Sequence, residues 1–440
     1  MADPTPYTRR RFLEQGLVLA SATATLPTFL SHTGSALAGQ LRSDLSSLPG
    51  VPQDRVLVVV QLSGGNDGLN TVVPFGADAY HKARRGLAIG DALPLDDTQG
   101  IGLHPALRQF HELVGRGQAA AIQGVGYPNP NRSHFASMDV WHAGDTDAQG
   151  SRGVPTGWIG RALDTRMPKP GEQTDDPYQG LAAVAIGREA PSALRAKRAR
   201  PVTFENANLY RWAPSGKHDA LDQAYEALHD RPRAEAMPAA GAAAGPDARA
   251  FVYRTSLDAR ASSARIRRAV DTDPQTDFPN HGLARQLKTV AAMIRAQLPT
   301  RVYYVAQGGF DTHAGQAGRH QNLLRQFAQS MAAFQRELDA TGHADRVTTF
   351  AFSEFGRRVS ANASGGTDHG AAGPVFLMGD RVKAGLLGKH PSLTDLDRGD
   401  LKFNVDFRSI YTALLEDWLG VDAQAALDGR FGKPELFVKA

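Results

Sequence analysis

The sequence predicts an α/β protein, a three-layer α/β/α sandwich around a largely parallel central sheet. Short apolar runs typical of buried strands alternate along the chain with longer stretches in which apolar residues recur at helical spacing. Several of these runs lead directly into glycine-rich loops that carry Asp, Glu or His. In open α/β sheets, ligands bind beyond the carboxyl ends of the strands, so we expect these loops to form one site.

The first half of the chain supplies two predicted strands and two predicted helices. We expect a strand over 56–62, a helix over 103–114, a short strand over 119–122, a loop over 124–131 and a helix from about Ser133 through Trp141. The first helix is indicated by Leu107, Phe110 and Leu113, which share one face at this spacing. The serine that opens the second helix is a common helix cap.

The second half begins with a region that has no regular pattern. We expect 168–279 to be an irregular insertion that contains a loop rich in Ala, Pro and Gly at 236–250. Beyond it we expect a helix over 283–298, a strand over 302–306, a helix over 321–340, strands over 347–352 and 374–378, and a helix over 406–420. The chain from 39 to 440 is therefore expected to form a single domain interrupted by that insertion.

The first 38 residues have the pattern of an export signal. Thr8 to Leu13 match the twin-arginine sequence, an apolar segment follows from Gly16 to Leu30, and Ala36-Leu37-Ala38 is a small-residue cleavage site. We expect residues 1–38 to be recognised by the twin-arginine export machinery, and the mature protein to be periplasmic or secreted. The chain contains no cysteine, so its core has to be stable without disulfides.

Charge, hydropathy and missing motifs exclude several classes of protein. The net charge is +4 and the arginines form no long runs, which argues against nucleic acid as the main partner. The export segment is too short for a stable membrane span, and no later stretch is apolar enough to be one. The sequence has no serine-hydrolase elbow, zincin helix, phosphate-binding P-loop or dinucleotide fingerprint.

Three candidate metal ligands follow the first strand and the 302–306 strand. Asp67, in a Gly-Gly-Asn-Asp-Gly turn, is either an ordinary turn carboxylate or a ligand. Asp311 and His313 are separated by one residue, so on an extended loop both side chains point the same way. They either bind a divalent ion such as zinc or manganese, or form a loop pair in which Asp311 caps the following helix.

Three further candidates follow the 347–352 strand. Glu354 is expected to be buried, and an ionised carboxylate there needs either an arginine (Arg357 or Arg358) or a cation as its partner. Asp368 and His369 lie between glycines, which let the backbone approach a ligand closely. We expect His369 to bind the metal, and Asp368 either to bind it too or to hold the imidazole in place.

The catalytic candidates lie at the start of the helix that begins near Ser133. Ser133 is either a helix cap or a nucleophile, because a helix N-terminus stabilises both an alkoxide and a bound anion. Arg132 would add a positive charge for a phosphate or sulfate oxygen. His134 is the third catalytic candidate.

At these residues the chain resembles a bacterial family known only as domain of unknown function 1501, within the alkaline phosphatase and sulfatase-like superfamily. The matching motifs are Leu62 to Gly68, Asn131 to Phe135, Gly309 to His313, Ser353 to Arg357 and Gly366 to Gly370. The resemblance implies an alkaline-phosphatase-like fold, with Asp67, Asp311, His313 and His369 as metal ligands and Ser133 as the nucleophile.

Glu354 matches a further carboxylate of the superfamily site, which usually has a histidine beside it. This chain has Phe355 at that position. With one imidazole fewer, the site holds one metal, or Asp368 or His134 compensates, or catalysis is weak.

We therefore expect an exported metal-dependent hydrolase of phosphate or sulfate esters that uses zinc or manganese and acts on a small anionic ester. The alternative is a non-catalytic periplasmic binding or envelope-associated protein on the same scaffold, with a degenerate metal site.

Overall fold

The computed structural model describes residues 54–96, 98–148, 155–167, 182–207 and 262–438. The predicted export signal and the 236–250 segment lie outside the described residues. Within the described part of the chain, none of the helices combines the length and hydropathy that crossing a bilayer requires.

A nine-stranded mixed sheet forms the centre of the described structure, in the order β11-β5-β10-β9-β1-β8-β6-β7 with β14 beside β5. Its strands are β1 (Val56–Leu62), β5 (Ala119–Gly126), β6 (Ala183–Ile186), β7 (Val202–Phe204), β8 (Val302–Gln307), β9 (Val347–Phe352), β10 (Gly373–Met378), β11 (Gly385–Leu387) and β14 (Val405–Asp406). All the pairings are parallel except those of β10 with β5 and β9.

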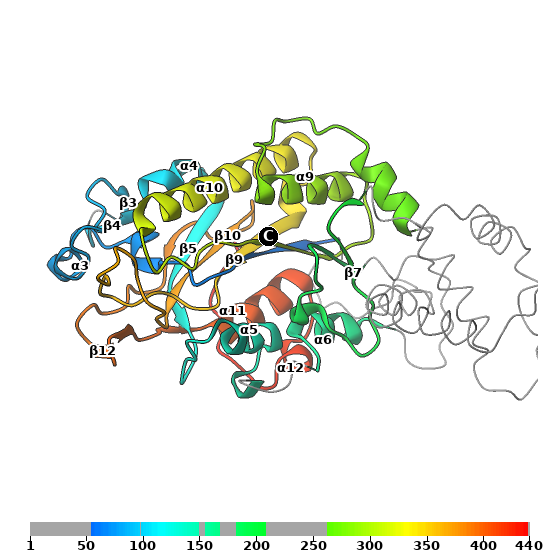
Figure 1. The fold of residues 1–440 in the computed structure, drawn as a ribbon. Coiled ribbons are helices and arrows are strands. Elements are labelled where there is room, and N and C mark those ends of the chain that lie inside the picture. The colour runs from blue at the N-terminus through cyan, green and yellow to red at the C-terminus, as the bar shows by residue number, and fades with distance from the viewer. Residues whose placement is uncertain (1–53, 97, 149–154, 168–181, 208–261, 439–440) are drawn as a thin grey trace, which may run out of the picture.

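Helices cover both faces of this sheet (Figure 1). One face carries α4 (Arg108–Gly115), α9 (Gly282–Arg295) and α10 (Gln316–Ala340). The other carries α5 (His134–Ala143), α6 (Trp158–Thr165), α11 (Phe407–Ala413) and α12 (Ala423–Ala426). The predicted three-layer α/β/α sandwich with a largely parallel sheet is therefore confirmed.

The strand β1 shows why both faces are covered. Val56, Val58 and Val60 belong to one buried apolar cluster, while Leu57 and Val59 belong to another. Successive side chains of a strand point to opposite faces, so a run that is apolar at nearly every position requires a helical layer on each side.

Smaller elements flank the sheet. A helix, α3 (Asp78–Ala83), lies near a three-stranded sheet made of β2 (Val72–Val73), β3 (Leu93–Asp96) and β4 (Ile101–Leu103). A two-stranded sheet joins β12 (Leu396–Asp397) to β13 (Asp400–Leu401).

Several predicted boundaries are wrong for identifiable reasons. The helix expected from 103 starts at Arg108, because Ile101–Leu103 pairs with other strands and Pro105 opens a separate short turn. The strand expected to stop at 122 continues to Gly126, since it pairs with the long β10. The region 168–279, expected to be irregular, contains the strands β6 and β7.

Strand direction decides which loops meet. β1, β8 and β9 run parallel and in level register, with Gln61 opposite both Ala306 and Phe352. β5 runs in the same direction, because it is antiparallel to β10, which is antiparallel to β9. The loops after β1, β5 and β8, and the loop that joins β9 to β10, therefore lie at one edge of the sheet.

Candidate metal centre

Four side chains from three of these loops converge at this edge. Asp311 and His313 follow β8, His369 precedes β10, and His134 begins the helix α5 that follows β5. His134, Asp311 and His369 each offer one ligand atom within 4.8 Å of the others. His313 completes the group, because its Nε2 lies 3.0 Å from Asp311 Oδ1 and 2.9 Å from His369 Nε2.

The hydrogen bonds of His134, His313 and His369 favour the same tautomer in all three imidazoles. Nδ1 of His134 donates to Glu354 Oε1 at 2.7 Å, and Nδ1 of His369 donates to the carbonyl of Arg132 at 2.7 Å. Nδ1 of His313 lies 3.3 Å from Asp368 Oδ1. Because each Nδ1 faces an oxygen that can only accept, the hydrogen belongs on Nδ1 and the lone pair on Nε2.

The four groups fit a divalent cation. His369 Nε2 lies 3.2 Å and His134 Nε2 lies 3.5 Å from oxygens of Asp311. Ligand atoms held at about 2.0–2.2 Å from one ion are no more than about 4 Å apart, and these two distances meet that limit. Nε2 of His134 is buried and makes no hydrogen bond among the described residues, as expected for an atom that binds a metal ion.

The donor set indicates the kind of ion. Three imidazole nitrogens and one carboxylate suit zinc, manganese or a similar borderline divalent metal better than calcium or magnesium, which prefer oxygen. The side chains of Asp311 and His313 are 47% and 46% exposed, so the group opens to solvent on one side. That opening is what an exchangeable ligand or a substrate requires.

A buried arginine supports the carboxylate of this cluster. Arg357 is fully buried and donates to Asp311 Oδ1 at 2.7 Å, while its other donors bind main-chain carbonyls of Gly65 and Thr367. Partial burial opposes ionisation of Asp311, but the hydrogen bond and the charge of Arg357 outweigh it and lower the pKa of Asp311 to about 2. Asp311 is therefore an anion at neutral pH.

The surroundings shift the pKa values of two partly buried imidazoles, those of His134 and His369, in opposite directions. The hydrogen bond to Glu354 raises the pKa of His134 above its ordinary value, against the effect of burial. Burial lowers the pKa of His369, although its hydrogen bond to the Arg132 carbonyl opposes the change. A lowered pKa keeps the Nε2 lone pair of His369 available near neutral pH.

Glu354 and Asp368, both predicted metal ligands, lie behind the imidazoles. Glu354 Oε1 accepts from His134 and, at 2.8 Å, from the amide of Gly64, so neither predicted arginine is its partner. Gly64 has a φ of +120°, and a Cβ there would come within 2.4 Å of the Asp311 amide. A glycine is thus required where two loops of the site cross.

Asp368 lies behind His313 in the same way as Glu354 lies behind His134. It faces His313 and accepts a hydrogen bond at 3.0 Å from the amide of Asn362, which is the main cause of its lowered pKa. Both carboxylates occupy the position from which an acidic residue commonly orients a metal-binding histidine.

Asp67, another predicted ligand, lies apart from this group. It is completely buried and forms a two-pronged ion pair with Arg84, including a bond of 2.9 Å from Nη2 to Oδ1. Gln316 donates to its other oxygen, and the amide of Asn70 lies 3.4 Å from Oδ1. Protein donors thus occupy the carboxylate that we expected to face a metal.

The three catalytic candidates have different surroundings. Arg132 directs its guanidinium to Asp400, with a 2.8 Å bond from Nε, so it is not free to hold an anion as expected. Ser133 is exposed and is the N-cap of α5, but its hydroxyl makes no capping hydrogen bond. His134 belongs with the candidate metal ligands.

Phe355 forms a wall of the cluster. Its ring centroid lies 4.9 Å from that of His134 and 4.8 Å from that of His369. On the other side, a Cβ on Gly65 would lie 2.4 Å from its ring. The aromatic residue therefore packs the imidazoles in place and leaves no room for a further ligand from its own position.

Sequence reasoning did not identify Arg84, and it considered Arg357 only as a partner of Glu354. Arg84 and Arg357 are completely buried, yet each looks like an ordinary surface residue in the sequence. The one indication of buried arginines in the sequence was the number of carboxylates at strand ends, because a buried carboxylate needs a cationic partner.

No curated protein matches the chain in sequence. Among solved structures it is similar to a protein of the alkaline phosphatase superfamily from Vibrio parahaemolyticus (11% identity, 92% of this chain and 77% of that one, TM-score 0.37). It is also similar to the lipoteichoic acid synthase LtaP from Listeria monocytogenes (10%, 90% and 79%, TM-score 0.36). These scores are low, so the fold class rests on the sheet order and layers described above.

The sequence of the described region matches one family closely enough to assign it. Residues 54–434 match the family described as "Protein of unknown function (DUF1501)". This span contains every candidate site residue named above. The chain therefore belongs to the DUF1501 family.

Proposed function

We propose that this protein is an exported, metal-dependent hydrolase of phosphate or sulfate esters. The observation that carries the proposal is the convergence of three imidazole Nε2 atoms on the carboxylate of Asp311, with every Nδ1 directed at an oxygen. A divalent cation held by His134, Asp311, His313 and His369 would polarise an ester oxygen and lower the pKa of a hydroxyl or water beside it.

The chain's own residues have distinct parts in this proposal. Glu354 and Asp368 hold two of the imidazoles in the required orientation, and Arg357 holds Asp311. Ser133, next to His134 in the chain, is the candidate nucleophile, because its exposed hydroxyl lies at the positive end of α5. The N-terminus of that helix also favours the negative charge of a phosphate or sulfate group.

A second candidate function is supported by the closed environment of Asp67. Its pairing with Arg84, together with Phe355, favours one cation instead of two. A two-metal site stabilises both the attacking and the leaving oxygen of the reaction, and a single ion does not. A single ion is therefore compatible with binding of an anionic ligand as well as with hydrolysis. The alternative is therefore a non-catalytic periplasmic protein that binds an anionic ligand through this ion.

Elemental analysis and a substrate panel separate these functions. We expect about one zinc or manganese ion per chain, and turnover of aryl phosphates or aryl sulfates by the wild type. His369→Ala should lose both, whereas His81→Ala, which changes an exposed histidine of α3, should lose neither. Bound metal without turnover of any ester would favour the binding protein, and absence of metal would contradict both.

The nucleophile needs its own test. If Ser133 attacks the ester, Ser133→Ala should lose turnover and keep the metal. Equal turnover in Ser133→Ala and the wild type would assign the attack to water.

Export is proposed from the N-terminal sequence alone. Replacing Arg9 and Arg10 by lysine should leave the protein in the cytoplasm when residues 1–38 are present. Cell fractionation measures this, and unchanged export would contradict the twin-arginine assignment.

A further inference from the structure

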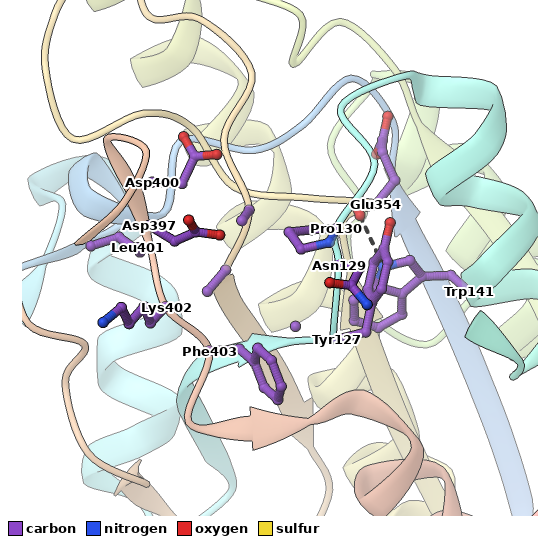
Figure 2. Close-up of a pocket in the computed structure, with 13 residues that line it drawn as sticks. Tyr127, Asn129, Pro130, Trp141, Glu354, Asp397, Asp400, Leu401, Lys402 and Phe403 are labelled. Atoms are coloured by element: carbon purple, nitrogen blue, oxygen red, sulfur yellow. Dashed lines mark hydrogen bonds between the residues drawn. The ribbon is translucent and has the colours of Figure 1, made fainter. Parts of the chain in front are cut away.

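Two arginines lie near one buried carboxylate at the rim of the candidate metal centre. The carboxylate is that of Asp400 in β13, and Figure 2 shows it across a cavity from Asn129 and Pro130, which lead into Arg132. Arg132 binds Asp400, and Arg358, from the loop that follows β9, lies near it. The side chains of both arginines are 37% exposed, so solvent reaches both.

The single negative charge of Asp400 is already used by Arg132. Nε and Nη2 of Arg132 both donate to Asp400 Oδ2, the first at 2.8 Å. Nε of Arg358 lies 3.7 Å from Asp400 Oδ1, which is beyond hydrogen-bonding distance. The Arg358 guanidinium makes one long hydrogen bond of 3.4 Å, from Nη2 to the carbonyl of Arg398. Arg358 is therefore a loosely held cation whose charge is largely uncompensated.

No other described carboxylate neutralises Arg358. Asp397, which lies opposite Asp400 in the two-stranded sheet, is 3.4 Å from Arg398. Among the described residues, Asp400 is the only carboxylate within ion-pair distance of Arg358. This rim thus carries one positive charge more than its own acidic groups balance.

Arg358 lies on the open side of the metal centre. Its amide donates to the carbonyl of Asp368 at 3.0 Å. The hydrogen bond from Asn362 is the main cause of the lowered pKa of Asp368, and the charge of Arg358 adds a smaller share. Asp368 Oδ1 lies 3.3 Å from Nδ1 of His313, and the two side chains are 56% and 46% exposed. One carboxylate and one imidazole therefore separate Arg358 from the proposed ion.

Arg358 differs in this from the buried arginines of the centre. Arg84 and Arg357 are completely buried, and their guanidiniums bind Asp67 and Asp311. Arg358 is half-buried, and most of its donors have no protein acceptor among the described residues. A guanidinium in this state can donate two parallel hydrogen bonds to a carboxylate, phosphate or sulfate group.

We propose that Arg358 binds a second anionic group of the ester, while the group to be hydrolysed lies at the metal centre. The preferred substrates would therefore carry two oxyanionic groups instead of one. The inference rests on the proposed function for the reaction itself. Binding of the second group requires no catalysis, so the two proposals can fail separately.

Arg358→Gln removes the charge and leaves the surrounding main chain as it is. The amide and carbonyl of Arg358, which bond to Asp368 and Arg84, remain when the side chain alone is changed. The matched control is Arg398→Gln, because the Arg398 side chain belongs to the same rim and is 79% exposed. Metal content is measured in each variant and should equal that of the wild type.

Carboxylates that cannot be hydrolysed measure the second site by itself. Benzoate carries one carboxylate, whereas isophthalate and terephthalate carry two at different separations. Calorimetric titration of the full chain with its metal should show at least one dicarboxylate binding about tenfold more tightly than benzoate, as expected for one hydrogen-bonded charge pair. This advantage should shrink as the salt concentration rises, because the site is partly exposed.

The variants decide whether Arg358 is the cause. Arg358→Gln should abolish the advantage of the dicarboxylate, and Arg398→Gln should keep it. Wild-type protein that binds neither dicarboxylate better than benzoate would overturn the proposal, whatever the stability of the variants. An advantage that survives in Arg358→Gln would overturn it too.

Turnover then connects the second site to the reaction. For the wild type, kcat/KM should be higher for carboxyphenyl phosphate or sulfate than for the phenyl ester, and Arg358→Gln should lower this ratio mainly by raising KM for the carboxyphenyl ester. Dicarboxylate binding through Arg358 without turnover of any ester would remove the proposed hydrolase function and keep the second anion site. Turnover of esters with no advantage for dicarboxylates would keep the function and remove the site.

Discussion

Asp67 and Asp311 both follow strands of the same sheet edge, but their surroundings are opposite. Asp67 is inaccessible to solvent, and Arg84 and Gln316 occupy its oxygens. Asp311 is half exposed and faces the Nε2 atoms of three imidazoles at 3.0–3.5 Å. A strand-end carboxylate is therefore a candidate ligand only where neighbouring side chains keep lone pairs available for a metal. The carboxylate of Asp67 pairs instead with a buried protein cation, Arg84.

Removing that internal cation should have the largest effect. Arg84→Met leaves Asp67 buried without its partner, which is expected to lower the free energy of unfolding by about 3–5 kcal/mol. Urea denaturation measures the change. The control is Arg85→Met, which alters the exposed neighbour and should be close to neutral. A loss no greater than that of the control would show that the buried pair contributes no stability.

The two carboxylates should differ most clearly in metal content. Asp311→Asn removes a proposed ligand and should lower metal affinity and ester turnover by about 100-fold or more, beyond the usual cost of altering an outer partner. Asp67→Asn should keep its metal while losing stability. Plasma mass spectrometry on purified protein measures the metal content. Loss of metal in Asp67→Asn but not in Asp311→Asn would show that Asp67, and not Asp311, binds the ion.

The residues behind the imidazoles should have smaller effects. Glu354→Gln weakens the orientation of His134 and should lower metal affinity by about 10- to 100-fold. Asp368→Asn should cost less, because the Asp368 side chain is 56% exposed and its hydrogen bond to His313 is long. Competition with a chelator ranks the two variants, and a larger loss for Asp368→Asn would show that it binds the ion itself.

The smallest effect concerns acid stability. Burial opposes ionisation of Asp67, but the charge and hydrogen bonds of Arg84 lower its pKa in the folded protein below the unfolded value of about 3.9. Its stabilising contribution is thus present above about pH 4 and is lost as the pH falls through the folded pKa. For one group, the slope is at most about 1.4 kcal/mol per pH unit.

Asp67→Asn should reduce the decrease in the free energy of unfolding as the pH falls. The check is urea denaturation of both proteins between about pH 5 and pH 3. Parallel pH profiles would mean that Asp67 has the same pKa in the folded and unfolded chains.

The sequence by itself determined the alternation of elements and most of the site's residues. The strands Val56–Leu62 and Val347–Phe352 were predicted to the residue, because six of the seven positions of the first and all six of the second are buried and leave a largely apolar pattern. Asp311, His313 and His369 were predicted as ligands from loops after or before such strands, and the structure brings them together.

Only the tertiary structure decided how each polar group is used. His134 joins the cluster because the antiparallel β10 makes β5 parallel to β9, so the end of β5 lies at the same edge. Arg84 reaches Asp67, and Arg357 reaches Asp311, across 17 and 46 positions of sequence. Local patterns encode burial and periodicity, whereas the partner of a buried charge depends on strand order and loop packing, which no local spacing specifies.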